Sequence, residues 1–120
     1  MRILGFSKKW PKLQQSVFTT FRFTRRDRDW QVGKLVQVVI KPRTPSLEVL
    51  GPAEIIGKEP RWIFSAKKPR GAKMLTRREA IIDGHKNYFD MAMWLSDTHG
   101  HSRLVNEPMN KLTLRRVKGE

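Results

Sequence analysis

Residues 17–24 read Val-Phe-Thr-Thr-Phe-Arg-Phe-Thr, and this stretch decides the fold class of the 120-residue chain. It is rich in β-branched and aromatic residues, and its polarity alternates as it does in a β-strand. The alternation sorts the side chains onto two faces and places Thr20 and Arg22 on the same one. We therefore predict a strand whose one face carries a hydroxyl group beside a guanidinium group.

Four further stretches have the composition of strands, so strands outnumber helices along the chain. They cover residues 3–6, residues 34–41, residues 47–57 (interrupted by Gly51-Pro52) and residues 112–117. The connections between elements are short, which favours a small curled sheet or barrel. We therefore predict an α+β fold, a small β-barrel of about five or six strands flanked by two or three short helices.

Two short helices are predicted before the last strand. Thr76 followed by Glu79 is a capping-box pattern, and the helix that it begins ends near Gly84. Asn87 can cap a second helix, and Gly100 can end it. The sequence contains no internal repeat and no interdomain linker, so we predict a single domain over the whole chain.

Positive charge dominates the composition. The chain has 25 Lys and Arg residues against 11 Asp and Glu, which gives a formal net charge of +14. Self-repulsion of this size opposes compactness and usually reflects a partner that supplies negative charge. We therefore expect the protein to bind a polyanion, of which a nucleic acid is the leading candidate.

Several other classes are disfavoured. No apolar run approaches the roughly 18–20 residues that span a bilayer. The first ten residues lack the features of a signal peptide. Cysteine is absent, which excludes disulfides and thiolate zinc sites. We therefore expect a cytoplasmic protein without a cofactor or metal, a membrane association or an obligate protein partner.

The positive charge is concentrated in two clusters that we predict to rim one cleft. The first follows residues 17–24, and the second is a basic loop at residues 64–74, which lacks periodicity and is predicted to be mobile. Trp62 lies beside this loop and is the best candidate to stack on an unpaired base. The residues assigned to nucleic-acid binding are Arg22, Arg25, Arg26, Arg28, Trp62, Lys67, Lys68, Arg70 and Lys73. The alternative is that these charges are solvated and serve solubility.

Most of the chain resembles a known family. Residues 17–22, followed by Asp29-Trp30-Gln31-Val32-Gly33-Lys34 and an apolar strand, resemble the ASCH family of the PUA-like superfamily. Residues 75–84 and 88–95 are similar to that family's helical insertion. The similarity runs in order from about residue 3 to residue 117. It implies a small β-barrel with a cleft between the barrel and the helices, usually associated with RNA.

The resemblance also implies candidate catalytic residues, because one branch of the family consists of acetylcytidine amidohydrolases and ribonuclease activity has been proposed for others. Of the positions that carry the family pattern, Thr20 and Arg22 match, whereas Gln15 and Val17 depart from it. Val17 replaces the lysine expected to act in the amidohydrolase branch. Asp83 falls where that branch has an acidic residue. If the protein is an enzyme, Thr20 and Asp83 are therefore the catalytic candidates.

The missing lysine weakens the enzyme hypothesis. Amide hydrolysis by this scheme needs an amine, a hydroxyl nucleophile and a carboxylate that moves protons. Lys12 or Lys8 could reach in from the preceding turn. The leading hypothesis is therefore a nucleic-acid-binding module, with RNA slightly ahead of DNA as its ligand, whose cleft holds a base or modified nucleotide. The alternative is a hydrolase that acts on RNA or on a modified nucleoside.

Overall fold

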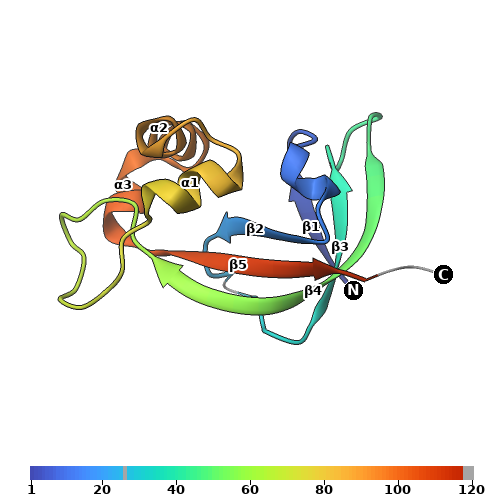
Figure 1. Cartoon of the computed structure of the whole chain (residues 1–120), viewed down its shortest axis with the longest axis horizontal. Coiled ribbons are helices and arrows are strands. Elements are labelled where there is room, and N and C mark those ends of the chain that lie inside the picture. Colours follow the sequence, from blue (N-terminus) through green and yellow to red (C-terminus); the bar gives the residue numbers. More distant parts are fainter. Residues whose placement is uncertain (26, 118–120) are drawn as a thin grey trace.

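The residues that the structure describes form one open, five-stranded mixed sheet with three α-helices. The computed structural model describes residues 1–25 and 27–117. The order of the elements, followed by colour in Figure 1, is β1 (Arg2–Phe6), η1 (Pro11–Gln14), β2 (Val17–Arg22), β3 (Leu35–Ile40), β4 (Glu48–Arg61), α1 (Arg77–Asp83), α2 (Tyr88–His99), α3 (His101–Asn106) and β5 (Met109–Arg116). Within the sheet the strand order is β1-β3-β4-β5-β2. β1 runs parallel to β3, and the other neighbours are antiparallel.

The predicted closed barrel is wrong. β1 and β2 are the two edges of the sheet, and in the described residues no backbone ladder joins them. A side chain connects the edges instead: the Arg22 guanidinium on β2 donates a hydrogen bond of 2.8 Å to the carbonyl of Gly5 on β1. Strand composition predicts that strands form, but it does not say which edges pair. The space between β1 and β2, which we call the seam, is where the barrel stays open.

The predicted strands are present, although some of their ends differ. The stretch predicted at residues 47–57 continues to Arg61, so Gly51-Pro52 does not interrupt β4. The register between β3 and β4 instead shifts between Val38 and Val39, which is how a bulge absorbs an irregular position. The last strand begins at Met109 and so is longer than predicted. Strand ends are set by tertiary contacts and are therefore hard to place from composition.

The predicted helix caps are confirmed. The Thr76 hydroxyl accepts a 3.1 Å hydrogen bond from the backbone N–H of Glu79, and the Glu79 carboxylate accepts one of 3.0 Å from the backbone N–H of Thr76. The Asn87 side chain accepts a 2.8 Å bond from the backbone N–H of Asp90 and begins α2. After α2 ends at Gly100, α3 adds a helix that was not assigned from the sequence.

Within the described part of the chain, two hydrophobic cores lie in succession along a longest dimension of 46 Å. The first packs the curled sheet against η1, and the second packs the helices against the other end of the sheet (Figure 1). Among the fully buried members of the first core are Leu4, Leu13, Leu112 and Leu114. Among those of the second are Ala80, Met91, Leu104 and Met109. The seam lies where the two cores meet, since Phe6 of β1 belongs to the first and Phe21 of β2 to the second.

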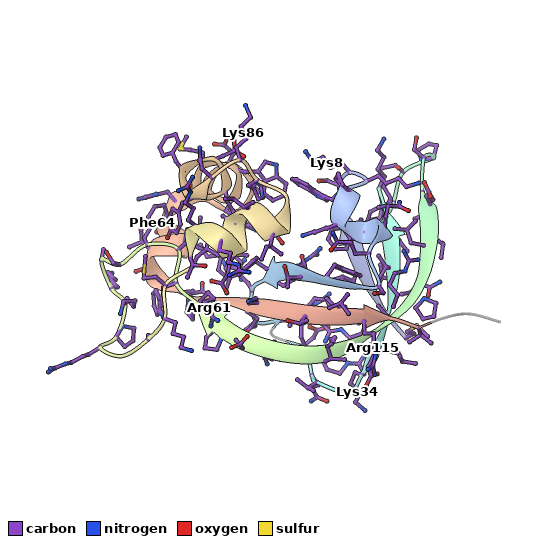
Figure 2. The ribbon with its side chains drawn as sticks, viewed as in Figure 1. Lys8, Lys34, Arg61, Phe64, Lys86 and Arg115 are labelled. Atoms are coloured by element: carbon purple, nitrogen blue, oxygen red, sulfur yellow. The ribbon has the colours of Figure 1, made fainter. Side chains whose placement is uncertain are left out.

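Glu79 fastens α1 to the sheet. Its carboxylate accepts a 3.1 Å hydrogen bond from Nε of Arg61, at the end of β4, and lies 2.8 Å from Nζ of Lys111 on β5. Figure 2 shows Arg61 where β4 approaches this helix. Burial pushes the pKa of Glu79 upward, but hydrogen bonds from Lys111 and Thr76 outweigh it and hold the pKa below its usual value. The ionised carboxylate therefore stabilises the fold.

Replacing Glu79 should make the protein less stable in a pH-dependent way. Because the folded-state pKa is lowered, the stabilisation is present above the usual glutamate pKa of 4.5 and is lost as the pH falls through the folded value. Glu79→Gln should therefore cost about 3 kcal/mol near neutral pH, since it leaves Arg61 without its buried partner. The cost should shrink in acid. Urea unfolding at several pH values measures both effects.

Glu107→Gln is the matched control for this prediction. Glu107 also pairs with an arginine, but its ion pair with Arg103 is exposed, and such pairs contribute less than about 1 kcal/mol. Equal losses of stability in the two variants would contradict the anchoring role of Glu79.

Candidate functional site

The seam contains a cavity of about 200 Å³. Gly5 and Phe6 line it from β1, and Thr20, Phe21 and Arg22 line it from β2. η1, the end of α1 and α2 supply the remaining walls. Thr20, Arg22 and Asp83, the three residues that the sequence placed in one cleft, all line this cavity.

A buried ion pair closes one side of the cavity. Nζ of Lys12, on η1, lies 2.5 Å from Oδ1 of Asp83, the last residue of α1, and both side chains are at most 10% exposed. Burial raises the pKa of Asp83 and lowers the pKa of Lys12, and in each case the partner's charge opposes the shift. A carboxylate at the C-terminal end of a helix is also disfavoured by the helix dipole. The ionised form of Asp83 therefore depends on the charge of Lys12. Of Lys8 and Lys12, it is Lys12 that reaches into the cavity from the turn before β2.

Gly84 determines how α1 meets η1. Its φ of +115° is a left-handed conformation that favours glycine. A Cβ atom at this position would lie only 2.8 Å from Cε3 of Trp10. Glycine is therefore required both for its backbone conformation and for its lack of a side chain. The close contact with Trp10 lets the residues before and after Gly84, Asp83 and His85, approach the cavity.

His85 continues the polar cluster away from Lys12. Its side chain is buried, with Nε2 3.7 Å from Oδ2 of Asp83 and Nδ1 3.3 Å from Oδ2 of Asp90. Asp90, on α2, is half exposed, so the cluster extends from the cavity towards solvent. No role for His85 was predicted, because a histidine after a helix-ending glycine is usually a surface residue.

Thr20 and Arg22 form the polar part of the β2 wall. Nε of Arg22 donates a 3.2 Å hydrogen bond to Oγ1 of Thr20. Because this bond uses the oxygen of Thr20 as an acceptor, its hydroxyl hydrogen remains available to a ligand. Burial lowers the pKa of Arg22 to about 10, an effect that the charge of Asp83 opposes, so Arg22 is still positively charged at neutral pH.

Aromatic rings form the wall opposite the sheet. The ring centroid of Trp10 lies 5.2 Å from that of His85 and 5.7 Å from that of Trp94, with the two indoles nearly perpendicular. Trp94 lines the cavity and is 36% exposed, whereas Trp10 is buried. The role of Trp94 was not predicted, because α2 has apolar residues on more than one face and the pattern does not single out this tryptophan.

An open groove of about 830 Å³ continues from the cavity. Arg22 and His99 line both, so the two spaces adjoin. Arg25 and Arg103 add positive charge to the groove, and Glu107, which pairs with Arg103, offsets part of it. The Arg103 guanidinium stacks over Phe23 at 3.8 Å from the ring centroid. Arg103 was not predicted, because it lies on the unassigned helix α3.

The other predicted binding residues are spread over the surface. Arg25 borders the groove, Arg28 borders a separate cavity, and Arg26 lies outside the described residues, as do residues 118–120. The Trp62 side chain is 8% exposed, so its ring does not present a face to solvent in this conformation.

The basic loop at residues 64–74 lies apart from the cavity. It leaves the end of β4 on the helical side of the molecule, far from η1 (Figure 1). None of Lys67, Lys68, Arg70 and Lys73 lines the cavity or the groove. Nζ of Lys68 donates a 2.8 Å hydrogen bond to the carbonyl of Ala72 within the loop. The loop is therefore a second basic surface and does not rim the cavity.

Comparison of the chain with models of protein families, with curated proteins and with solved structures yields no match. Across residues 1–25 and 27–117, no helix has the length and apolar character needed to cross a membrane. The same part of the chain holds no group of three or more His, Cys, Asp or Glu side chains suited to a metal ion.

Removing the charge of Lys12 should raise the pKa of Asp83 further. In Lys12→Met the burial of Asp83 persists, while its main attractive partner is gone. The stabilising contribution of Asp83 is then fully present below the usual aspartate pKa of 3.8 and is lost as the pH rises through the raised value. Carboxyl ¹³C NMR titration measures the pKa.

Lys9→Met is the control, because the Lys9 side chain is half exposed and pairs with Glu48. It should leave the pKa of Asp83 unchanged. If Lys12→Met does not fold at neutral pH, the double variant Lys12→Met/Asp83→Asn should recover part of the stability, since it removes the unpaired charge that Lys12→Met leaves on Asp83. An unchanged or lower pKa of Asp83 in Lys12→Met would contradict the prediction.

Proposed function

We propose that the protein binds single-stranded nucleic acid, RNA in preference to DNA, and that the seam cavity takes one base or modified base. The observation that carries this proposal is the continuity of an aromatic-walled cavity with an arginine-lined groove, through Arg22 and His99. A strand needs both surfaces, because its bases are planar and its backbone is negatively charged.

The size and chemistry of the cavity support this ligand class. Its volume of about 200 Å³ is below the ≈ 300–1,000 Å³ typical of pockets for drug-sized ligands. The cavity volume therefore suits a single base of a longer strand. Trp94 offers a surface on which a base can stack. Lys12, Thr20 and Arg22 can donate hydrogen bonds, and Asp83 can accept one, so the cavity can satisfy the mixed polar edge of a base.

The groove supports binding of the backbone. Arginine forms bidentate hydrogen bonds with phosphate, and Arg25 and Arg103 line the groove with Arg22. The net charge of +14 favours a partner that brings many phosphates. The resemblance to the ASCH family supports RNA as the preferred strand, and we place this activity in the cytoplasm.

Trp94→Ala should weaken binding of single-stranded RNA. Loss of one stacking surface costs about 1–3 kcal/mol, or roughly 5- to 150-fold in affinity. Phe89→Ala is the matched control, because Phe89 is an aromatic residue of the same helix that is 71% exposed and does not line the cavity. Fluorescence anisotropy with a labelled oligonucleotide across a salt series measures both. Absence of binding at low salt, or affinity that does not depend on salt, would overturn the proposal.

A hydrolase is the second candidate, and the Lys12–Asp83 pair beside Thr20 favours it. Val17, the residue at the family's lysine position, is 43% exposed and does not line the cavity. Lys12 brings an amine into the cavity from η1 instead. The lowered pKa of Lys12 and the raised pKa of Asp83 suit an ammonium group that donates a proton and a carboxylate that accepts one. Such a pair could activate the Thr20 hydroxyl or a water molecule and protonate the departing amine.

The hydrolase candidate predicts turnover that depends on the cavity. Purified protein incubated with acetylcytidine or with labelled RNA should release product, and Asp83→Asn or Thr20→Val should lower the rate by at least about 100-fold. Lys8→Met is a control, since Lys8 stacks on Trp10 without lining the cavity. Turnover that Asp83→Asn does not change would point to another site or to a contaminant. Salt-dependent binding without turnover would contradict the hydrolase candidate and support the binding function.

A further inference from the structure

A second cavity, of about 260 Å³, lies beside the start of β3. It combines a buried apolar floor with a positively charged rim. Trp30, Val36 and Ile55 contribute to the floor. Three cationic residues contribute to the rim beside one carboxylate: Arg2, Arg28 and Lys34, with Asp29. Figure 2 shows Lys34 on the side of the molecule away from the helices. The same two properties, an aromatic surface and cationic side chains, characterise the seam cavity and its groove.

Trp30 separates this second cavity from the groove. Its side chain lines both spaces. The indole is held in place because its Nε1–H donates a 3.3 Å hydrogen bond to the carbonyl of Phe23. The guanidinium of Arg2 lies 4.2 Å from the centre of the ring, and that of Arg25 lies 5.8 Å from it. A strand that leaves the groove at Arg25 therefore meets the second cavity on passing Trp30.

Polar atoms near this cavity are incompletely bonded. Within the described residues, Nη2 of Arg2 and Oδ1 of Asp29 are buried and have no hydrogen-bond partner. A neighbouring atom of each side chain is bonded: Nη1 of Arg2 donates a 3.0 Å bond to the carbonyl of Asp29, and Nζ of Lys58 bonds to Oδ2 of Asp29. A buried donor or acceptor without a partner costs about 1–3 kcal/mol. A ligand that brings both an acceptor and a donor would recover part of this cost.

We propose that the second cavity is a further nucleotide subsite, so that one strand runs from the seam cavity, through the groove, past Trp30 and into this site. This inference rests on the proposed binding of single-stranded nucleic acid. It predicts that affinity depends on strand length, because a short ligand fills the seam cavity alone and a longer one reaches both. Arg28 and Lys34 would meet the phosphates of the longer strand.

The test compares single-stranded RNAs from a mononucleotide to about eight nucleotides by anisotropy or calorimetry. Wild-type affinity should rise once the strand spans both cavities. Arg28→Glu and Lys34→Glu should remove that rise, lowering the affinity of the longest strand by about tenfold or more while leaving the shortest ligands nearly unchanged. Arg78→Glu is the matched control, because Arg78 is exposed and lines neither cavity nor the groove. It carries the same charge change and should weaken all lengths alike.

NMR gives an independent readout. The indole N–H signal of Trp30 should shift with the long strand and not with the mononucleotide, whereas the signal of Trp94 should shift with both. If short ligands bind and the three charge variants weaken every length equally, the second subsite is refuted while the proposed function stands. If no strand of any length binds at low salt, the proposed function itself is refuted.

Discussion

The ion pair between Lys12 and Asp83 is the interaction on which the arrangement of the cavity depends. It joins η1, which covers the first core, to α1, which belongs to the second. A buried ion pair contributes little net stability, because desolvation of the charges offsets their attraction. The ion pair instead positions the groups around it. It holds the end of α1 so that Gly84 contacts Trp10 and Asp83 faces the same cavity as Thr20.

The open seam explains why the site is located between β1 and β2. Had the two edge strands paired through their backbones, the ladder would have occupied the space in which the side chains of Thr20 and Arg22 now meet a cavity. Arg22 bridges the edges through Gly5 and still faces the cavity and the groove. One side chain thus joins the two edges of the sheet and supplies positive charge to both the cavity and the groove.

The features that were predictable from sequence are those whose signals lie close together in the chain. β2 follows from its alternation, and α1 follows from the Thr76 and Glu79 capping box. Closure of the sheet was mispredicted, because edge pairing depends on contacts between distant residues. The grouping of Thr20, Arg22 and Asp83 came from the family resemblance, whereas His85 and Trp94 were missed. Their roles arise from the contact of Gly84 with Trp10, which no local pattern encodes.

The pairing of β2 has a consequence for how the protein is made. Within the described residues β2 pairs with β5 alone, and the register matches Val17 with Arg115 and Arg22 with Asn110. Pairings between such distant segments form slowly, because a long loop must close before any contact repays its entropy. During synthesis, β2 therefore has no strand to pair with until β5 has left the ribosome. The wall that carries Thr20 and Arg22 is completed only then, so the nascent chain is highly basic well before its cavity is complete.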